Sequence, residues 1–162
     1  MLTPEQKLIY YQHPHLAEGI LKTELAKKKQ IVYGARASNI HLPYYLQKNT
    51  EDYDVLTKKP EQEAKELVKR LNKEYGGEYF RNEQAKHKGT YKVVSNVTNK
   101  TIADFTRAYK HPKTKEVLGI KYAQPSSIKR AIIKSLKNPE AEFRRDKYME
   151  TLQRLRLGER IW

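Results

Sequence analysis

The first half of the chain alternates between segments with helical and with strand periodicity. Apolar residues recur at helical spacing over residues 4–28, where three lysines mark the helix C-terminus. The apolar run 31–34 predicts a buried strand that ends at a glycine, and residues 35–42 predict a short helix. A second strand is predicted at 52–57. The clearest helix is 59–77, because a proline and acidic residues open it and two glycines close it.

The second half predicts four more strands and then two helices. Polar turn signals separate four segments with strand character, at 78–84, 90–97, 100–108 and 117–123. Two helices that begin near a proline follow at 125–138 and 139–157. This order of elements predicts an α+β fold with a mixed sheet flanked by helices. We expect residues 1–124 to form the main domain, and residues 125–162 to pack on it as a helical segment of one compact unit.

Composition narrows the class of protein. The 162 residues contain no cysteine, which excludes disulfides and thiolate metal sites and is typical of a reducing compartment. No apolar run approaches the roughly 20 residues that span a membrane. The N-terminal residues also lack the pattern of a secretory signal. We therefore expect a cytoplasmic protein without a membrane partner, in the host cytoplasm if its origin is viral.

Positive charge is concentrated toward the C-terminus. The formal net charge is +14, and residues 107–162 hold 15 Lys and Arg against 6 Asp and Glu. Such an excess favours contact with a polyanion, either nucleic acid or nucleotide phosphates. A solubilising surface is the alternative interpretation of the same residues.

Three acids stand in apolar strand segments, where Asp is disfavoured. Asp52 and Asp54 are two positions apart in one strand, so their side chains share a face. Asp104 lies in another strand, and if the two strands are neighbours the three carboxylates converge. Clustered carboxylate oxygens suit Mg²⁺, and two such ions about 4 Å apart support in-line phosphoryl transfer. A pair of acids alone also occurs as surface residues or turn caps.

A second candidate feature follows the first buried strand. Gly34 stands at a strand-to-helix junction, where backbone N–H groups and the helix dipole favour a phosphate. Arg36 could pair with that phosphate through its fork of donors, and Ser38 could add a hydroxyl.

The ordered set of these residues resembles a known family. The segment "GARASNIHLPYYLQKNTEDYDV", a helix after it and an Asp on a later strand resemble the polymerase-β-type nucleotidyltransferase superfamily. Within it, the chain is most similar over residues 30–157 to poly(A)-polymerase-like proteins of large DNA viruses. The resemblance implies a nucleotidyltransferase fold, two Mg²⁺ or Mn²⁺ ions and an NTP donor, with ATP as the expected one.

The resemblance also assigns roles to single residues. Gly34 matches the glycine at the triphosphate, and Asp52 and Asp54 match the paired metal ligands. Asp104 matches the third carboxylate, which would hold one metal and help to deprotonate the acceptor hydroxyl. Ala35 stands where the family usually has Gly or Ser, so a hydroxyl contact to phosphate is absent unless Arg36 or Ser38 replaces it.

Basic and aromatic residues of the C-terminal part are further candidates. We expect Lys121 and Lys129 to bind the nucleotide. A basic cluster at residues 144–147 is expected to contact the triphosphate or a nucleic acid strand, with Tyr122 stacking on a base. Its three cations are Arg144, Arg145 and Lys147. A solvated helix face and a buried aromatic are the alternatives. The apolar residues of the C-terminus suggest a homo-oligomer or a partner subunit.

These observations predict a Mg²⁺-dependent enzyme that moves a nucleoside monophosphate from an NTP to a hydroxyl. The acceptor is expected to be an RNA 3′ end in preference to DNA. Two alternatives stay open: a nucleic-acid-binding protein of the same fold without catalysis, and a transferase that modifies a protein, as in toxin–antitoxin systems.

Overall fold

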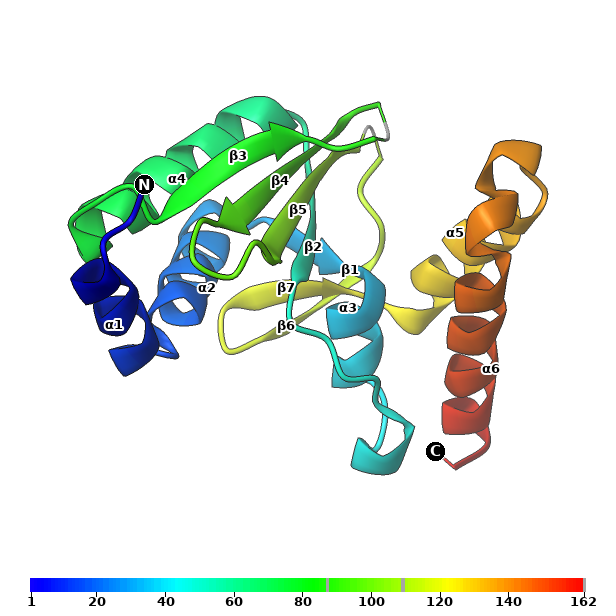
Figure 1. Cartoon of the computed structure of the whole chain (residues 1–162). Coiled ribbons are helices and arrows are strands. Elements are labelled where there is room, and N and C mark those ends of the chain that lie inside the picture. The colour runs from blue at the N-terminus through cyan, green and yellow to red at the C-terminus, as the bar shows by residue number, and fades with distance from the viewer. Residues whose placement is uncertain (87, 109, 162) are drawn as a thin grey trace.

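The protein is built around a seven-stranded mixed sheet with the strand order β3-β4-β5-β2-β1-β7-β6 (Figure 1). The computed structural model describes residues 1–162 except 87, 109 and 162, and the side chain of residue 161. The strands are β1 (Ile31–Tyr33), β2 (Tyr53–Thr57), β3 (Phe80–Gln84), β4 (Thr90–Ser95), β5 (Thr101–Arg107), β6 (Thr114–Val117) and β7 (Ile120–Ala123). The α-helices are α1 (Pro4–Gln12), α2 (Leu16–Lys28), α3 (Gly34–Ile40), α4 (Pro60–Tyr75), α5 (Pro125–Leu136) and α6 (Arg145–Ile161). Two 3-10 helices are η1 (Tyr44–Leu46) and η2 (Pro139–Arg144).

The centre of the sheet combines parallel and antiparallel pairs. Strand β2 runs parallel to β5 and antiparallel to β1, while β1 runs parallel to β7. The outer pairs β3–β4, β4–β5 and β6–β7 are antiparallel. This confirms the predicted α+β class with a mixed sheet, flanking helices and C-terminal helices.

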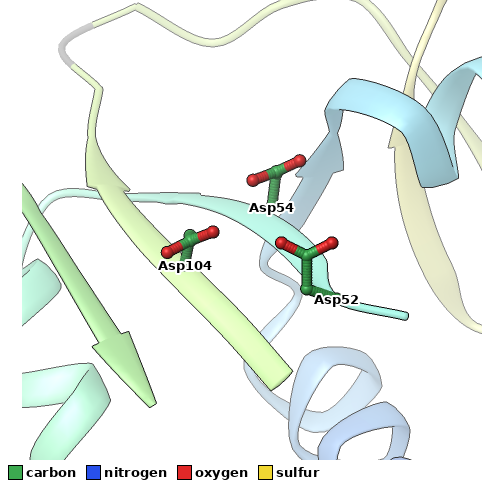
Figure 2. A group of neighbouring side chains, drawn as sticks. All are labelled: Asp52, Asp54 and Asp104. Atoms are coloured by element: carbon green, nitrogen blue, oxygen red, sulfur yellow. The ribbon is translucent and has the colours of Figure 1, made fainter. Parts of the chain in front are cut away.

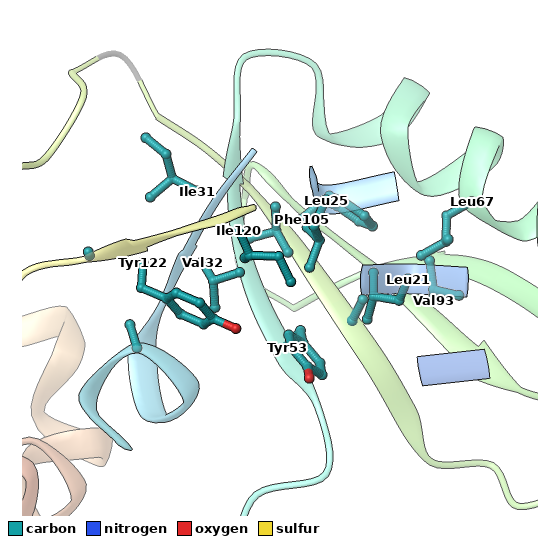
Figure 3. Close-up of a cluster of buried hydrophobic side chains, with 14 of the residues drawn as sticks. Leu21, Leu25, Ile31, Val32, Tyr53, Leu67, Val93, Phe105, Ile120 and Tyr122 are labelled. Carbon is teal, nitrogen blue, oxygen red and sulfur yellow. The ribbon is translucent and has the colours of Figure 1, made fainter. Parts of the chain in front are cut away.

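One face of the sheet forms the hydrophobic core. Alternation along the central strands directs Val32, Tyr53, Val55 and Phe105 to this face, where each is at most 3% exposed. Leucines of α2 and α4 pack against them, as Figure 3 shows for Leu21, Leu25 and Leu67. The residues between them on β2 and β5 must therefore point to the opposite face.

The helices α5 and α6 lie beside α3, away from α2 and α4 (Figure 1). They contact each other through buried apolar residues, and Lys129 of α5 forms an ion pair with Glu159 of α6. Gly158 is buried against Leu42, where a Cβ would meet a methyl carbon of that leucine at 2.6 Å. None of the described helices has the length and apolar character that crossing a membrane requires.

The single helix predicted over residues 4–28 is wrong. The structure divides it into α1 and α2 at His13-Pro14-His15. Pro14 has no N–H to donate, and the residue before a proline is sterically pushed out of the helical region. His13 accordingly has φ −123° and ψ 65°.

The single strand predicted over residues 117–123 is also wrong. The structure forms a hairpin of β6 and β7, with Leu118 and Gly119 in its turn. Both residues have positive φ, 50° and 82°, as two-residue hairpin turns of this hand require. The chain therefore gains a strand from residues that the sequence pattern assigned to a polar loop.

The predicted last helix, 139–157, begins differently from the expectation. Residues Pro139–Arg144 form η2, and the α-helix runs from Arg145 to Ile161. Asn138 caps η2 by accepting a hydrogen bond from the backbone N–H of Glu140 at 3.0 Å.

Candidate active site

The three predicted acids meet on the sheet face opposite the core (Figure 2). Asp54 of β2 lies directly beside Asp104 of β5, because these parallel strands pair in that register. Asp52, two residues earlier, points to the same side. One carboxylate oxygen of each acid lies within 4.8 Å of the others. Alternation in β2 thus supplies core residues to one face and carboxylates to the other.

The cluster is electrostatically costly without a cation. Burial, followed by the charges of Asp52 and Asp104, raises the pKa of Asp54 to about 7. Burial is also the largest of the causes that together raise the pKa of Asp104 to about 6. Oδ1 of Asp104 is buried and has no hydrogen-bond partner in the described part of the chain. Buried polar atoms are normally paired, so this oxygen and the set of carboxylates fit a divalent metal ion.

Hydroxyl groups fix the surroundings of the acids. Thr50 donates a hydrogen bond of 3.1 Å to Oδ1 of Asp52. Tyr33, the register partner of Asp54, donates to the hydroxyl of Thr106 at 3.1 Å. Thr106 also shares a 2.9 Å hydrogen bond with Thr90 of β4. The bond from Thr50 orients Asp52, and the other two link β1, β5 and β4 beside the acids.

Gly34 is the point where α3 approaches the acids. Its φ is +68°, and a Cβ at this position would collide with Oδ2 of Asp54. Both features restrict the position to glycine. The structure therefore brings the predicted glycine next to the predicted acids, with the first turn of α3 beside Asp54. Ala35, partly exposed, follows Gly34 in that turn.

Arg36 and Ser38 do not face the carboxylates. The guanidinium of Arg36 lies 4.2 Å from the ring centre of Tyr53, and its Nε donates to the backbone oxygen of Asp52 at 3.3 Å. Ser38 is fully buried and donates to the backbone oxygen of Gly34 at 3.1 Å. In these positions both stabilise the framework around Gly34 and Asp52, and the predicted contacts with phosphate find no support.

Two further candidates are occupied elsewhere. Tyr122 lies on the core face and is 7% exposed, so its ring cannot stack on a base in this structure. Lys129 is engaged with Glu159 between α5 and α6. Lys121 pairs in register with Ile31, which places it on the same sheet face as the acids, two strands from β2.

Arg144 is the residue of the basic cluster at 144–147 whose charge influences the acids. The positive charge of Arg144 opposes the burial-driven rise in the pKa of Asp54 and of Asp104. Its guanidinium lies 5.5 Å from the ring centre of Tyr148. Arg145 and Lys147 are exposed at the start of α6 and form no ion pair with the described residues. The structure thus brings Arg144 into the electrostatic surroundings of the acids.

Lys92 is a residue near the site that the sequence did not reveal. It stands on β4 as the register partner of Asp104. Its charge is the strongest influence that opposes the effect of burial on the pKa of Asp104, and it acts on Asp54 as well. The period-2 pattern of residues 90–97 predicts which residues share a face with Lys92, but the identity of its cross-strand neighbour depends on topology.

Comparison with known proteins agrees with this geometry. Residues 19–142 match the family described as "Poly(A) polymerase catalytic subunit". The chain belongs to this family. The matched segment includes Gly34 and all three acids, so the resemblance predicted from the sequence is confirmed. This membership agrees with the expectation of a nucleotidyltransferase-type enzyme.

Two solved structures are similar to the chain, and the first of them has the same fold. The Megavirus polyadenylate synthase is similar with a TM-score of 0.77 and 22% identity, over 93% of this chain and 32% of that chain. This chain therefore spans about a third of the length of that protein. JHP933 from Helicobacter pylori gives a TM-score of 0.42 at 18% identity, over 84% of this chain and 58% of that chain. No curated protein matches the chain significantly.

Proposed function

We propose that this member of the poly(A) polymerase catalytic family transfers a nucleoside monophosphate from an NTP to a hydroxyl acceptor. ATP is the proposed donor and an RNA 3′ end the proposed acceptor. The observation that carries the proposal is the convergence of Asp52, Asp54 and Asp104, with one buried carboxylate oxygen left without a partner. The viral polyadenylate synthase of the same fold supports it.

The proposed reaction is an in-line displacement at the α-phosphorus. The acceptor oxygen forms a bond to that phosphorus, and the bond to the oxygen that bridges to the β-phosphorus breaks, so pyrophosphate leaves. Asp52 and Asp54 would hold two Mg²⁺ or Mn²⁺ ions. Such ions supply Lewis-acid stabilisation of the attacking and leaving oxygens. Asp104 would hold one of the metal ions, orient the acceptor hydroxyl and help to take its proton.

The donor would lie on the α3 side of the acids. Gly34 leaves room for the triphosphate beside Asp54, and the first turn of α3 offers backbone N–H groups there. Arg144 would approach from the C-terminal helical segment. We propose accordingly that residues 1–124 form the catalytic unit, and that residues 125–162 close the donor side of the site.

Two rival functions are less well supported. A nucleic-acid-binding protein without catalysis has no need of a third buried acid with an unpaired oxygen. A transferase that modifies a protein would use the same donor chemistry, so only the acceptor separates it from the proposal.

The test is incorporation of label from α-³²P-labelled NTPs in the presence of Mg²⁺. The protein is incubated with a short single-stranded RNA, a DNA of the same sequence, and a mixture of candidate protein acceptors. Label on RNA, greatest with ATP, supports the proposal. Label on protein supports the rival transferase, and no label on any acceptor contradicts catalysis. The variant Glu51→Gln is the control for Asp52→Asn/Asp54→Asn, since it removes a carboxylate from the adjacent exposed residue.

A further inference from the structure

A groove of about 900 Å³ opens at the end of the sheet where β2 and β5 finish. It lies between this sheet end and the first turns of α4. Basic, aromatic and hydroxyl side chains line it, among them Lys58, Lys59, Lys88, Arg107, Tyr91 and Thr106. The candidate active site does not include it, although Thr106 belongs to both.

Cations reach the groove from three separate segments. Lys58 and Lys59 follow β2, Lys88 precedes β4, and Arg107 ends β5. Backbone hydrogen bonds hold these segments together, from the Arg107 N–H to the oxygen of Gly89 at 2.9 Å and from the Ala108 N–H to the oxygen of Thr57 at 3.0 Å. The cations are therefore kept close despite their mutual repulsion.

The two carboxylates that line the groove already form ion pairs, and its five cations outnumber them. Glu61 is paired with Lys65, and Glu66 with Lys28. The four cations at positions 58, 59, 88 and 107 form no ion pair with any described residue. The groove therefore carries an excess of positive charge that suits an anionic polymer.

The groove connects to the acids along β4 and β5. Arg107 is three residues beyond Asp104 on β5, roughly 10 Å along the strand, so its side chain lies on the opposite, α4 face, and a strand that leaves Asp104 reaches it around the end of β5. On β4, Lys92 is the register partner of Asp104 and Thr90 is the register partner of Thr106. Polar and basic side chains thus lead from Asp104 to the turn with Lys88, on the side of the acids away from Gly34.

From this arrangement we infer that the groove holds a single-stranded RNA acceptor upstream of its 3′ end. The inference rests on the proposed function, in which Gly34 marks the donor side and Asp104 receives the acceptor hydroxyl. The acceptor strand then continues from Asp104 past Lys92 and into the groove. Tyr91, the register partner of Phe105, lies on the α4 face and is partly exposed in the groove, where its ring can stack on a base once the strand has passed the end of β5.

The first test is RNA binding by a charge-reversed groove. The variant Lys88→Glu/Arg107→Glu is compared with Lys7→Glu/Lys69→Glu, which makes the same change in net charge on exposed faces of α1 and α4 outside the groove. Binding of a fluorescein-labelled 15-nucleotide RNA is followed by anisotropy without NTP. We expect the groove variant to bind at least 10-fold more weakly and the control to stay within twofold of the wild type. The slope of log K against the logarithm of the salt concentration should become shallower by about 1.4, because two phosphate contacts are lost.

Three results would overturn the inference. Equal weakening by both variants would mean that net charge alone attracts RNA. Unchanged binding by the groove variant would place the strand elsewhere. Tighter binding of an oligoglutamate peptide or of duplex RNA than of single-stranded RNA would assign the groove to another partner. Thermal unfolding checks that each variant is folded, and Lys88→Gln and Arg107→Gln replace the double variant if it is not.

Kinetics separate this inference from the proposed function. In the groove variant the KM for a 15-nucleotide primer should rise at least 10-fold, while the KM for ATP and the use of a dinucleotide primer stay within twofold. If no nucleotide is transferred to any acceptor but RNA binding still depends on the groove, the proposed function fails and the groove assignment stands. If transfer occurs and the groove variant uses long primers normally, the groove assignment alone fails.

Discussion

The two faces of the central strands have opposite effects on the stability of the fold. On the core face, Tyr53 and Val55 of β2 and Phe105 of β5 are buried among leucines, and their burial stabilises the fold. On the other face, Asp54 and Asp104 of the same strands are partly buried among like charges, which destabilises it. One alternating backbone therefore carries both the core and a strained anionic site, and substitutions should affect one face without the other.

The largest effect on stability is expected on the core face. Phe105→Ala removes a 2%-exposed ring and should lower the free energy of unfolding by about 3–5 kcal/mol, because a cavity replaces it. Denaturant unfolding measures this loss. Transfer activity per folded molecule should stay within a few-fold of the wild type. Unchanged stability would mean that this face is not the core of the fold.

Removing a charge from the acidic face should raise the free energy of unfolding, whereas the loss of Phe105 lowers it. Because the pKa of Asp54 is raised to about 7 in the folded protein, ionising it opposes folding as the pH rises between about 4 and 7. Without divalent cations, Asp54→Asn should therefore be more stable than the wild type at pH 8, on the order of 4 kcal/mol. The advantage should vanish below about pH 4. Unfolding curves at several pH values test this, and a variant less stable than the wild type at pH 8 would contradict the account.

A substitution at Gly34, where α3 approaches the acids, should have an effect of intermediate size, and this effect is on transfer activity. Gly34→Ala places a Cβ against Asp54 at a positive φ, so α3 or the carboxylate must shift. We expect transfer activity to fall by about 10- to 100-fold, since positioning in this chemistry is sensitive to displacements of about 1 Å. Gly19→Ala is the control, because a Cβ there meets no atom within 4 Å. Equal losses in both variants would remove the special role of Gly34.

The smallest effect is expected at Lys92. Its charge opposes the burial-driven rise in the pKa of Asp104, so Lys92→Met should move the acid limb of the kcat/KM profile to higher pH. Lys100→Met, on an exposed residue paired with Glu51, should leave the profile in place. An acid limb that does not move in Lys92→Met would show that another group controls it.

The alternation of residues made one part of the site predictable. Asp52 and Asp54 share a face because they are two positions apart in a strand, and Gly34 marks a junction that needs its conformation. Their meeting with Asp104 was expected on the condition that the two strands are neighbours, which the structure fulfils.

The parts that the sequence did not predict depend on tertiary contacts. Lys92 gained its neighbour through strand pairing, which a single-strand pattern does not contain. Arg36 turned toward the ring of Tyr53, and Tyr122 toward the core, because neighbouring elements decide which side a long side chain takes. The β6–β7 hairpin was hidden because its turn places Leu118, a residue unusual at positive φ, in the left-handed region.

The central claim is that the three carboxylates form a divalent-metal site that binds a nucleotide. Calorimetric titration of ATP tests it most directly, in EDTA and in Mg²⁺ or Mn²⁺, for the wild type, Asp104→Asn, Asp52→Asn/Asp54→Asn and the control Glu51→Gln. The account predicts that the metal raises ATP affinity at least 10-fold in the wild type and in Glu51→Gln, and that the gain is lost in the other two variants. ATP affinity that is the same with and without metal, and unchanged by these substitutions, would contradict it.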